Sequence, residues 1–266
     1  MSLTAPHATP RPATSRMRSY WLEAKTEILK SWRLPVYSVF TLVFPIMFYL
    51  IFGLTFGEQA GGAANLAAYM LATYGAFGVI GAALFGFGVG VATERGQGWM
   101  LLKRASPMPP MAYFFAKLVM ALVFSTLVVL SLSVLGYAVF GVRLPVGEAL
   151  ALFGTLLLGA LPFCAMGLAL GYLAGPNSAA AVVNVVYLPM VFASGLWIPI
   201  DQLPGFMQAI APALPPYHYA QLALGTIGFD LGGSPLVHAA VLLGFTAVFL
   251  AISIWLYRRD EGATFG

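Results

Sequence analysis

Residues 93–110 (TERGQGWMLLKRASPMPP) form a charged stretch with two glycines between two long apolar runs. Glu94 near its start, and Lys103 with Arg104 near its end, suit the dipole of a short helix, which favours anions at its N-terminus and cations at its C-terminus. Only 8% of the chain is charged, so these side chains are expected in water or at lipid headgroups. The stretch could dock another molecule or be an ordinary basic loop beside a membrane, and its charge leaves both interpretations open.

Ser194 and His238 could supply the nucleophile and the base of a serine hydrolase. The Ala-Ser-Gly sequence at 193–195, followed by a later histidine, resembles the rhomboid-type intramembrane proteases. Their Gly-x-Ser-Gly motif would need glycine where this chain has Phe192. A serine that packs inside a helix and a histidine at a helix end are the other interpretation.

Other reactive groups are sparse. The three histidines (His7, His218 and His238) are too scattered to predict a metal site, and the single cysteine lies in an apolar run. A P-loop needs Gly-Lys before Ser or Thr, and no lysine here follows a glycine, so nucleotide hydrolysis would belong to a partner. No apolar run holds a carboxylate near its middle, so proton coupling is not expected; sodium held by carbonyls and hydroxyls stays open.

Composition then sets the class of protein that positions these residues. The chain is 60% hydrophobic, its mean hydropathy is +0.88, and it has nine acidic residues among 266. A soluble fold could not cover itself with so few polar groups. We therefore expect an all-α integral membrane protein with six transmembrane helices, an N-terminal interfacial helix and short re-entrant outer helices before the last span.

Each of the six apolar runs approaches or exceeds the roughly 20 residues that a membrane-spanning helix needs. Pro45, Pro162 and Pro189 fall inside runs and predict kinks. The four residues at 175–178 leave room only for a tight hairpin between the fourth and fifth runs. The predicted spans are 36–56, 66–92, 111–140, 147–174, 179–199 and 234–257.

The segments outside the predicted spans are assigned to the cytoplasmic side or to the outer side of the membrane. Residues 1–16 predict a disordered cytoplasmic tail, 17–34 an amphipathic interfacial helix, and 259–266 a second cytoplasmic tail. Nearly all basic residues fall at these segments or at 93–117, so both termini are expected on the cytoplasmic side. The proline-rich, apolar region 200–229 would form short helices that dip back into the outer leaflet, or a globular cap on the outer surface.

Small residues recur at intervals of four in two of the predicted spans. Such spacing permits close helix contact, within one chain or between two copies, and the sequence does not choose between them. These residues are Ala82, Gly86 and Gly90 in the second span, and Gly167, Gly171 and Gly175 in the fourth.

Two motifs carry a resemblance to a known family. The first is the Glu-Arg-Gly-x-Gly turn at 94–98, which leads into a leucine-rich segment and Ser106-Pro107; the second is the Ser-Gly to Leu-Pro stretch at 194–204. With the order of helices over 17–258, they resemble the ABC type-2 (ABC-2) exporter permeases. Residues 214–217 depart from the family, since they read Leu-Pro-Pro-Tyr where relatives more often have Asn-Pro-hydroxyl-Tyr.

The resemblance implies that 93–110 is a coupling helix seated in a groove of a cytoplasmic ATPase. It also implies two permeases that form a homodimer, with two ATPases that hold ATP and magnesium, and no cofactor on this chain. The partner surface would meet Glu94 and Arg95, while the glycines allow close backbone approach. The coupling residues would be Glu94, Arg95, Gly96, Gly98, Trp99, Lys103, Arg104 and Pro107.

A substrate route between protomers would follow the first, second and fifth spans. Aromatic rings offer broad apolar contact, and Asn and Tyr add hydrogen bonds, which suits an amphipathic cargo; lipid-facing or core packing is the plainer role for each residue. The route residues would be Phe40, Phe44, Phe48, Tyr74, Asn184 and Tyr187, with Phe192, Leu196 and Trp197 as an outer gate.

The leading hypothesis is therefore the permease subunit of an ATP-driven exporter of a drug, antibiotic, lipid or glycolipid, without catalysis of its own. It would be a multi-pass protein of a bacterial plasma (inner) membrane, in contact with lipid and with no nucleic-acid partner. The alternatives are an ATP-independent channel or carrier and the rhomboid-like protease.

Overall fold

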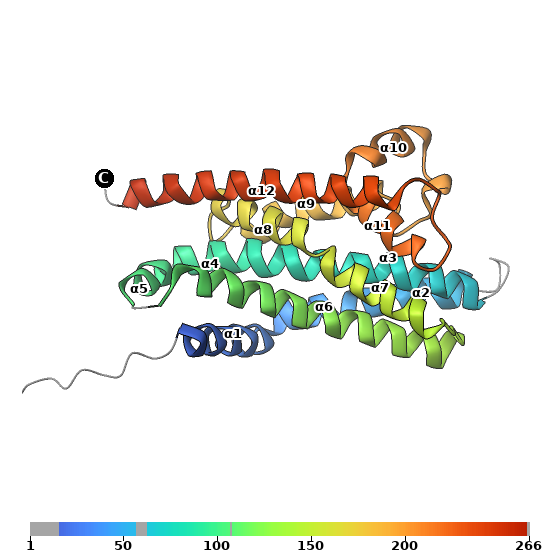
Figure 1. The fold of residues 1–266 in the computed structure, drawn as a ribbon, viewed down its shortest axis with the longest axis horizontal. Helices are drawn as coiled ribbons and strands as arrows, with labels where there is room; N and C mark the ends of the chain where they lie inside the picture. Colours follow the sequence, from blue (N-terminus) through green and yellow to red (C-terminus); the bar gives the residue numbers. More distant parts are fainter. Residues whose placement is uncertain (1–15, 57–62, 107, 265–266) are drawn as a thin grey trace, which may run out of the picture.

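The computed structural model describes residues 16–56, 63–106 and 108–264, and every regular element in these ranges is helical. Five helical runs are long and apolar enough to cross a membrane: Tyr37–Phe56, Ala64–Gly96, Met111–Phe140, Val146–Leu173 and Pro235–Asp260. They correspond to α2 (Pro35–Phe56), α3 (Ala63–Leu84) with its continuation, α6 (Pro110–Phe140), α7 (Val146–Leu158) with α8 (Leu161–Leu173), and α12 (Pro235–Thr264). Figure 1 shows these helices side by side along the long axis of the molecule.

The second span lies at the centre of the bundle. It runs from α3 through a π-helical turn, η1 (Phe85–Val89), into α4 (Gly90–Gly96). Helix α3 is rich in alanine and glycine and is buried along nearly its whole length, because α2, α6, α8 and α11 (Pro215–Gly225) all pack on it. Small side chains let these neighbours approach from every side.

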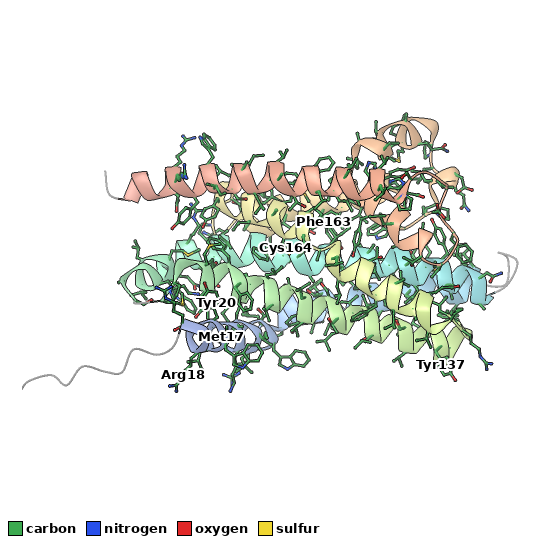
Figure 2. The ribbon with its side chains drawn as sticks, viewed as in Figure 1. Met17, Arg18, Tyr20, Tyr137, Phe163 and Cys164 are labelled. Carbon is green, nitrogen blue, oxygen red and sulfur yellow. The ribbon has the colours of Figure 1, made fainter. Side chains whose placement is uncertain are left out.

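The small residues of the fourth span serve contacts within this chain. A Cβ added at Gly171 would lie 3.0 Å from the carbonyl oxygens of Phe87 and Gly88 in η1, and one at Gly167 would lie 3.1 Å from the carbonyl oxygen of Ala83. Glycine is needed there because the backbones of two helices meet directly. Figure 2 shows Phe163 and Cys164 of the same helix in the interior of the bundle.

The fourth span is broken where the sequence predicts only a kink at Pro162. Helix α7 ends at Leu158, and α8 begins at Leu161 with the proline in its first turn, where a missing N–H costs nothing. The break is filled by Tyr219 of α11, whose hydroxyl donates to the Leu156 carbonyl at 2.6 Å. A Cβ at Gly159 would lie 2.1 Å from the Tyr219 ring, so the ring occupies the space that a side chain would need.

The expected fifth span is shorter than predicted. Helix α9 (Ala179–Ala193) has 15 residues, about 22 Å, against a hydrocarbon core of about 30 Å. It stops at Ser194 because Gly195 takes a left-handed turn with φ of 79°. Pro189 and Pro45 do lie inside their helices, in α9 and α2.

The region after α9 contains the predicted short helices. They are η2 (Ile200–Gln202), α10 (Gly205–Ile210), η3 (Ala211–Ala213) and α11. Helix α10 is exposed, whereas α11 is buried against α3, α7 and α12. Figure 1 places this region at the end of the bundle opposite α5 (Trp99–Ala105).

Helix α1 (Arg16–Trp32) packs lengthwise along the first half of α6. Its Tyr20 ring meets Phe115 with centroids 5.4 Å apart, and its Trp32 ring meets Phe124 at 6.1 Å, so the contacts advance in the same direction along both helices. The sequence predicts a helix on the membrane surface. In the structure α1 runs along α6, and acidic residues of α1 pair with lysines of α5 and α6.

Candidate functional site

The Glu-Arg-Gly-x-Gly segment forms the corner between α4 and α5. Gly98 has φ of 73°, a left-handed conformation that disfavours other residues, and this turn redirects the chain into α5. Gly96 lies against the hairpin between α8 and α9, where an added Cβ would be 2.5 Å from the Pro176 ring. One glycine therefore supplies the turn and the other a close contact.

Beside this corner lies a buried charge cluster made of Glu27 and Lys30 from α1, Glu94 from α4, and Tyr113 and Lys117 from α6. Glu94 is 3% exposed and Lys117 is 1% exposed. Glu94 accepts hydrogen bonds from Lys117 at 2.9 Å, from the Tyr113 hydroxyl at 2.7 Å, and from Lys30. Glu27 accepts from Lys30 at 2.7 Å and from Lys117 at 2.5 Å.

The charge cluster is electrically balanced. Two carboxylates face two ammonium groups, so every buried charge has an opposite partner, which a low-dielectric site requires. Burial disfavours the charged form of Lys30, but the attraction of Glu94 and Glu27 outweighs it and raises the pKa of Lys30 above its usual value. The cluster thus fastens α1 to α4 and α6 with charge-assisted hydrogen bonds.

Arg95 fastens the same corner to the other side of the bundle. Its Nη1 donates to the carbonyl oxygens of Gly171 at 2.9 Å and Tyr172 at 3.1 Å, at the C-terminal end of α8. Its guanidinium also pairs with Asp260 near the end of α12 and lies over the Tyr172 ring, 5.1 Å from the centroid. A planar cation suits this position because the last carbonyls of a helix carry partial negative charge.

Helix α5 itself projects from this braced corner and exposes apolar side chains. Leu102 is 71% exposed, and Trp99 and Leu101 are also exposed. Lys103 pairs with Glu23 of α1 and lies 4.3 Å from the centroid of the Tyr113 ring. Two hollows flank the helix: one of about 250 Å³ reaches Glu23 and Met108, and one of about 270 Å³ reaches Pro176 and Asp260.

Two residues of this segment that the sequence assigns to the partner surface, Glu94 and Arg95, have their partners within this chain. Glu94 is turned inward, so direct pairing of its carboxylate with another protein would require the charge cluster to open. Arg95 is likewise bonded to α8 and α12. Pro107 and the side chain of Arg104 lie outside the described residues. Sequence reasoning missed the partners of Glu94; the signal was Lys117, a lysine placed well inside an apolar run.

Three of the proposed route residues, Phe40, Phe44 and Phe48, belong to an aromatic row on α2. Phe40, Phe44, Phe48, Phe52 and Phe56 recur every four residues, and successive rings have centroids 4.9, 5.8, 6.2 and 5.8 Å apart. Phe40 is 55% exposed, so the row opens onto the outside of the bundle. Phe48 joins it to Trp197, with centroids 5.4 Å apart.

The remaining route and gate residues lie deeper or apart. Tyr74 and Tyr187 are buried, and their hydroxyls donate to the carbonyls of Trp197 at 3.3 Å and Phe77 at 2.8 Å. Asn184 donates to the carbonyl one turn earlier in α9. Two of the three gate residues contact each other, with the centroids of the Phe192 and Trp197 rings 6.2 Å apart. The third, Leu196, is buried.

Ser194 and His238 do not form a catalytic pair. The Ser194 hydroxyl is buried and donates to the Met190 carbonyl at 2.7 Å, the usual bond of a serine to its own helix. The His238 ring instead contacts His218. The hydrolase interpretation therefore lacks the geometry it needs. Among the described residues, no three His, Cys, Asp or Glu side chains gather as a metal site.

The described residues thus form the all-helical bundle of a multi-pass membrane protein, with five membrane-length helices and a braced, projecting helix at one end. Residues 18–228 match the family described as ABC-2 type transporter, and the chain belongs to that family. It is thus the membrane permease subunit of an ABC transporter, in which ATPase activity resides on a separate subunit.

Two relatives agree with this assignment. The protein YvfS of Bacillus subtilis (strain 168), whose name describes a transport permease, is 29% identical over 195 residues, 73% of this chain and 78% of the relative. The daunorubicin resistance ABC transporter permease protein DrrB1 of Streptomyces coeruleorubidus is 34% identical over 99 residues, 35% of this chain and 34% of the relative.

Proposed function

We propose that this chain is the permease of an ATP-driven exporter and that the separate ATPase moves it through α5. The observation that carries the proposal is the combination of an exposed apolar α5 with a corner fixed to four other helices. An exposed apolar surface rimmed by polar residues is typical of a protein docking site. For a movement of α5 to reach the rest of the bundle, α5 must be firmly attached to the other helices.

The contacts of Glu94 and Arg95 support a route for that transmission. A push on α5 reaches α1 and α6 through Glu94, and reaches α8 and α12 through Arg95. The second span carries both residues and lies at the centre of the bundle. Closure of the ATPases around ATP and magnesium would thus tilt the central span relative to its neighbours, and tilting of packed helices switches access from one face to the other.

The proposed assembly contains two permeases, most simply two copies of this chain, and two ATPases. Helix α2 supports it, because its aromatic row faces outward from the bundle and offers a surface for a second permease. The start of α1, the end of α12 and α5 lie at one end of the molecule (Figure 1), and the basic residues gather there. By the positive-inside rule this end would face the cytoplasm of a bacterium, below its inner membrane.

The proposed cargo is amphipathic: a drug, antibiotic, lipid or glycolipid. The five phenylalanines of α2 form a continuous apolar surface that could hold such a molecule between two permeases, and Phe48 leads from it to Trp197 at the outer gate. Tyr74 holds the Trp197 backbone, so movement of the second span would also move the gate. A relative named for daunorubicin resistance is consistent with an aromatic cargo.

The docking role of α5 is tested by Leu102→Glu, which puts a charge on the exposed apolar face without touching the charge cluster. The matched control is Phe206→Glu on α10, where the replaced side chain is 65% exposed at the opposite end of the bundle. After mild-detergent purification from native membranes, wild type and Phe206→Glu should retain a stoichiometric P-loop ATPase by mass spectrometry, and Leu102→Glu should lose it. Equal ATPase recovery in all three would refute the role of α5.

A further inference from the structure

The side of α1 that faces away from α6 carries two tryptophans and two basic residues. Trp21 is 71% exposed and Trp32 is 56% exposed, although tryptophan is highly buried on average in folded proteins. Lys25 and Arg33 are exposed beside them. Trp21, Lys25 and Trp32 follow one another at intervals of four and seven residues, so they share one stripe of the helix. These four residues are called the outer face of α1.

The charges of α1 are divided by sign between its two sides. Both carboxylates of the helix, Glu23 and Glu27, pair with lysines of α5 and α6 on the side that faces the bundle. In the part of the chain that the structure describes, no ion pair includes Lys25 or Arg33. The outer face therefore presents positive charge without a carboxylate to balance it.

The same combination of residues recurs on α12, at the same end of the bundle (Figure 1). Trp255 is exposed, and the Arg259 guanidinium lies 5.7 Å from the centroid of its ring. Helix α12 packs on α8 and α11, whereas α1 packs on α6. Exposed indole rings beside basic side chains thus occur on two separate helices, which indicates a layer surrounding the molecule rather than one local protein partner.

The length of α6 places the outer face of α1 at the level of the lipid headgroups. Helix α6 has 31 residues, about 46 Å, and therefore exceeds the hydrocarbon core of about 30 Å. Its first turns carry Lys117, whose ion pairs suit the end of a span better than its middle. Helix α1 packs along these turns, and the first span begins at Pro35, shortly after α1 ends at Trp32.

We propose that the outer face of α1 binds the headgroups of anionic phospholipids in the membrane leaflet at the α5 end of the molecule. Tryptophan prefers the headgroup level, where its ring lies among apolar groups and its N–H among polar ones. Lys25 and Arg33 supply the positive charge that attracts an anionic leaflet to an amphipathic helix. The two residue types therefore select the same surroundings.

Other occupants fit the outer face less well. A zwitterionic headgroup would satisfy the tryptophans but would add no net negative charge to balance Lys25 and Arg33. A second copy of this chain, related by a two-fold axis, would bring two positive faces together with no carboxylate between them. An anionic lipid supplies both the apolar surroundings and the missing charge.

The outer face and the charge cluster lie on opposite sides of one helix. Glu27 and Lys30 hold the inner side of α1 to Lys117 and Glu94. Anionic lipids can therefore bind α1 without displacing an ion pair of the charge cluster, and their attraction holds α1 at the membrane surface beside the corner between α4 and α5. This inference stands whether or not the exporter function is correct.

The test measures which lipid lies beside Trp21. Replacement of the other four tryptophans by Phe leaves Trp21 as the only indole, and the purified full chain is reconstituted into vesicles of phosphatidylglycerol and phosphatidylcholine. One of the two lipids carries bromine on its acyl chains, and bromine quenches indole fluorescence only at short range. At equal mole fraction, we expect brominated phosphatidylglycerol to be favoured at Trp21 by about fivefold. Salt raised from about 0.1 M to about 1 M should reduce this preference, because the Debye length falls from about 10 Å to about 3 Å.

Two double variants in the same chain separate charge from structure. Lys25→Gln with Arg33→Gln removes both charges of the outer face, so the two brominated lipids should then quench equally. Lys25→Arg with Arg33→Lys is the matched control, because it changes the same positions and keeps both charges, and it should keep the preference. A chain that retains Trp32 instead of Trp21 as its only tryptophan repeats the measurement if the first chain does not fold.

Three results would overturn the proposal. Equal quenching by the two brominated lipids without further substitution would show that the outer face does not select anionic lipid. No quenching by either lipid would show that protein, such as a second copy of this chain, covers the face. A preference that survives Lys25→Gln with Arg33→Gln would place the anionic lipid elsewhere. The readout needs neither transport nor an ATPase, so it is independent of the test of α5.

Discussion

Replacement of Lys117 by Met tests whether the charge cluster holds the corner between α4 and α5 in place. Met keeps the length of the side chain but removes its charge. Glu94 then loses the donor at 2.9 Å and Glu27 loses the donor at 2.5 Å, while Lys30 remains bonded to both carboxylates. The buried site changes from neutral to one net negative charge.

The size of the effect follows from that imbalance. Removal of one partner of a buried ion pair costs about 3–5 kcal/mol, because the charge left behind has been taken out of water. Glu94→Gln alone should cost a similar amount, since it leaves one net positive charge. The double variant is neutral again and keeps the Glu27–Lys30 pair at 2.7 Å. It should therefore cost less than either single change, where additivity would give roughly 6–10 kcal/mol.

The assay is reversible unfolding in mixed detergent micelles with increasing dodecyl sulfate, followed by the fluorescence of the five tryptophans. Lys25→Met is the matched control, because Lys25 is an exposed lysine of α1 and its loss should stay within about 0.5 kcal/mol. A cost below about 1 kcal/mol for Lys117→Met, or a double variant as unstable as the sum of the single ones, would refute the cluster as a balanced unit.

Three further predictions address the elements around the site. Gly159→Ala should cost about 1–3 kcal/mol in the same unfolding assay because its Cβ would lie 2.1 Å from the Tyr219 ring, and Tyr219→Ala in the same chain should lower the penalty for adding that Cβ. Arg95→Lys should slow transport-coupled ATP hydrolysis more than Asp260→Asn, since lysine cannot bridge the α8 carbonyls and the carboxylate together, whereas Asp260→Asn leaves the carbonyl bonds intact. Because the pKa of Lys30 is raised, the stability that its charge provides should be fully present below about pH 10.4 and lost as the pH rises through the higher folded-state value. A pH series of unfolding measures this as the difference from Lys30→Met, which lacks the contribution of Lys30.

The sequence identifies the membrane class and the order of helices because hydrophobic run length has a direct physical meaning in a bilayer. Five of the predicted spans appear as membrane-length helices with closely matching boundaries. The short helices after α9 also appear, since prolines there interrupt any longer helix. The two glycines of the corner between α4 and α5 are explained by the turn at Gly98 and the contact of Gly96 with Pro176.

The sequence could not predict the contacts between distant segments. Glu94 reads as a surface charge because its partners lie on α1 and α6, and no local pattern reports that pairing. His218 and His238 look scattered until α11 folds back on α12. The length of α9 is misjudged for a local reason, since the apolar run continues past the glycine that ends the helix.

The charge cluster also affects how α5, the proposed coupling helix, can move. A bundle held only by apolar packing could let α5 shift while α1 and α6 slide past it, because apolar contacts are not directional. The charge cluster does not permit that, since movement of α1, α4 or α6 alone would break ion pairs between helices, and three of the four charges are buried. The corner, α1 and the first half of α6 should thus move as one rigid body against α2 and α9. We expect any bending to occur where the helices are interrupted, at Gly159 in the fourth span and at Gly195 after α9.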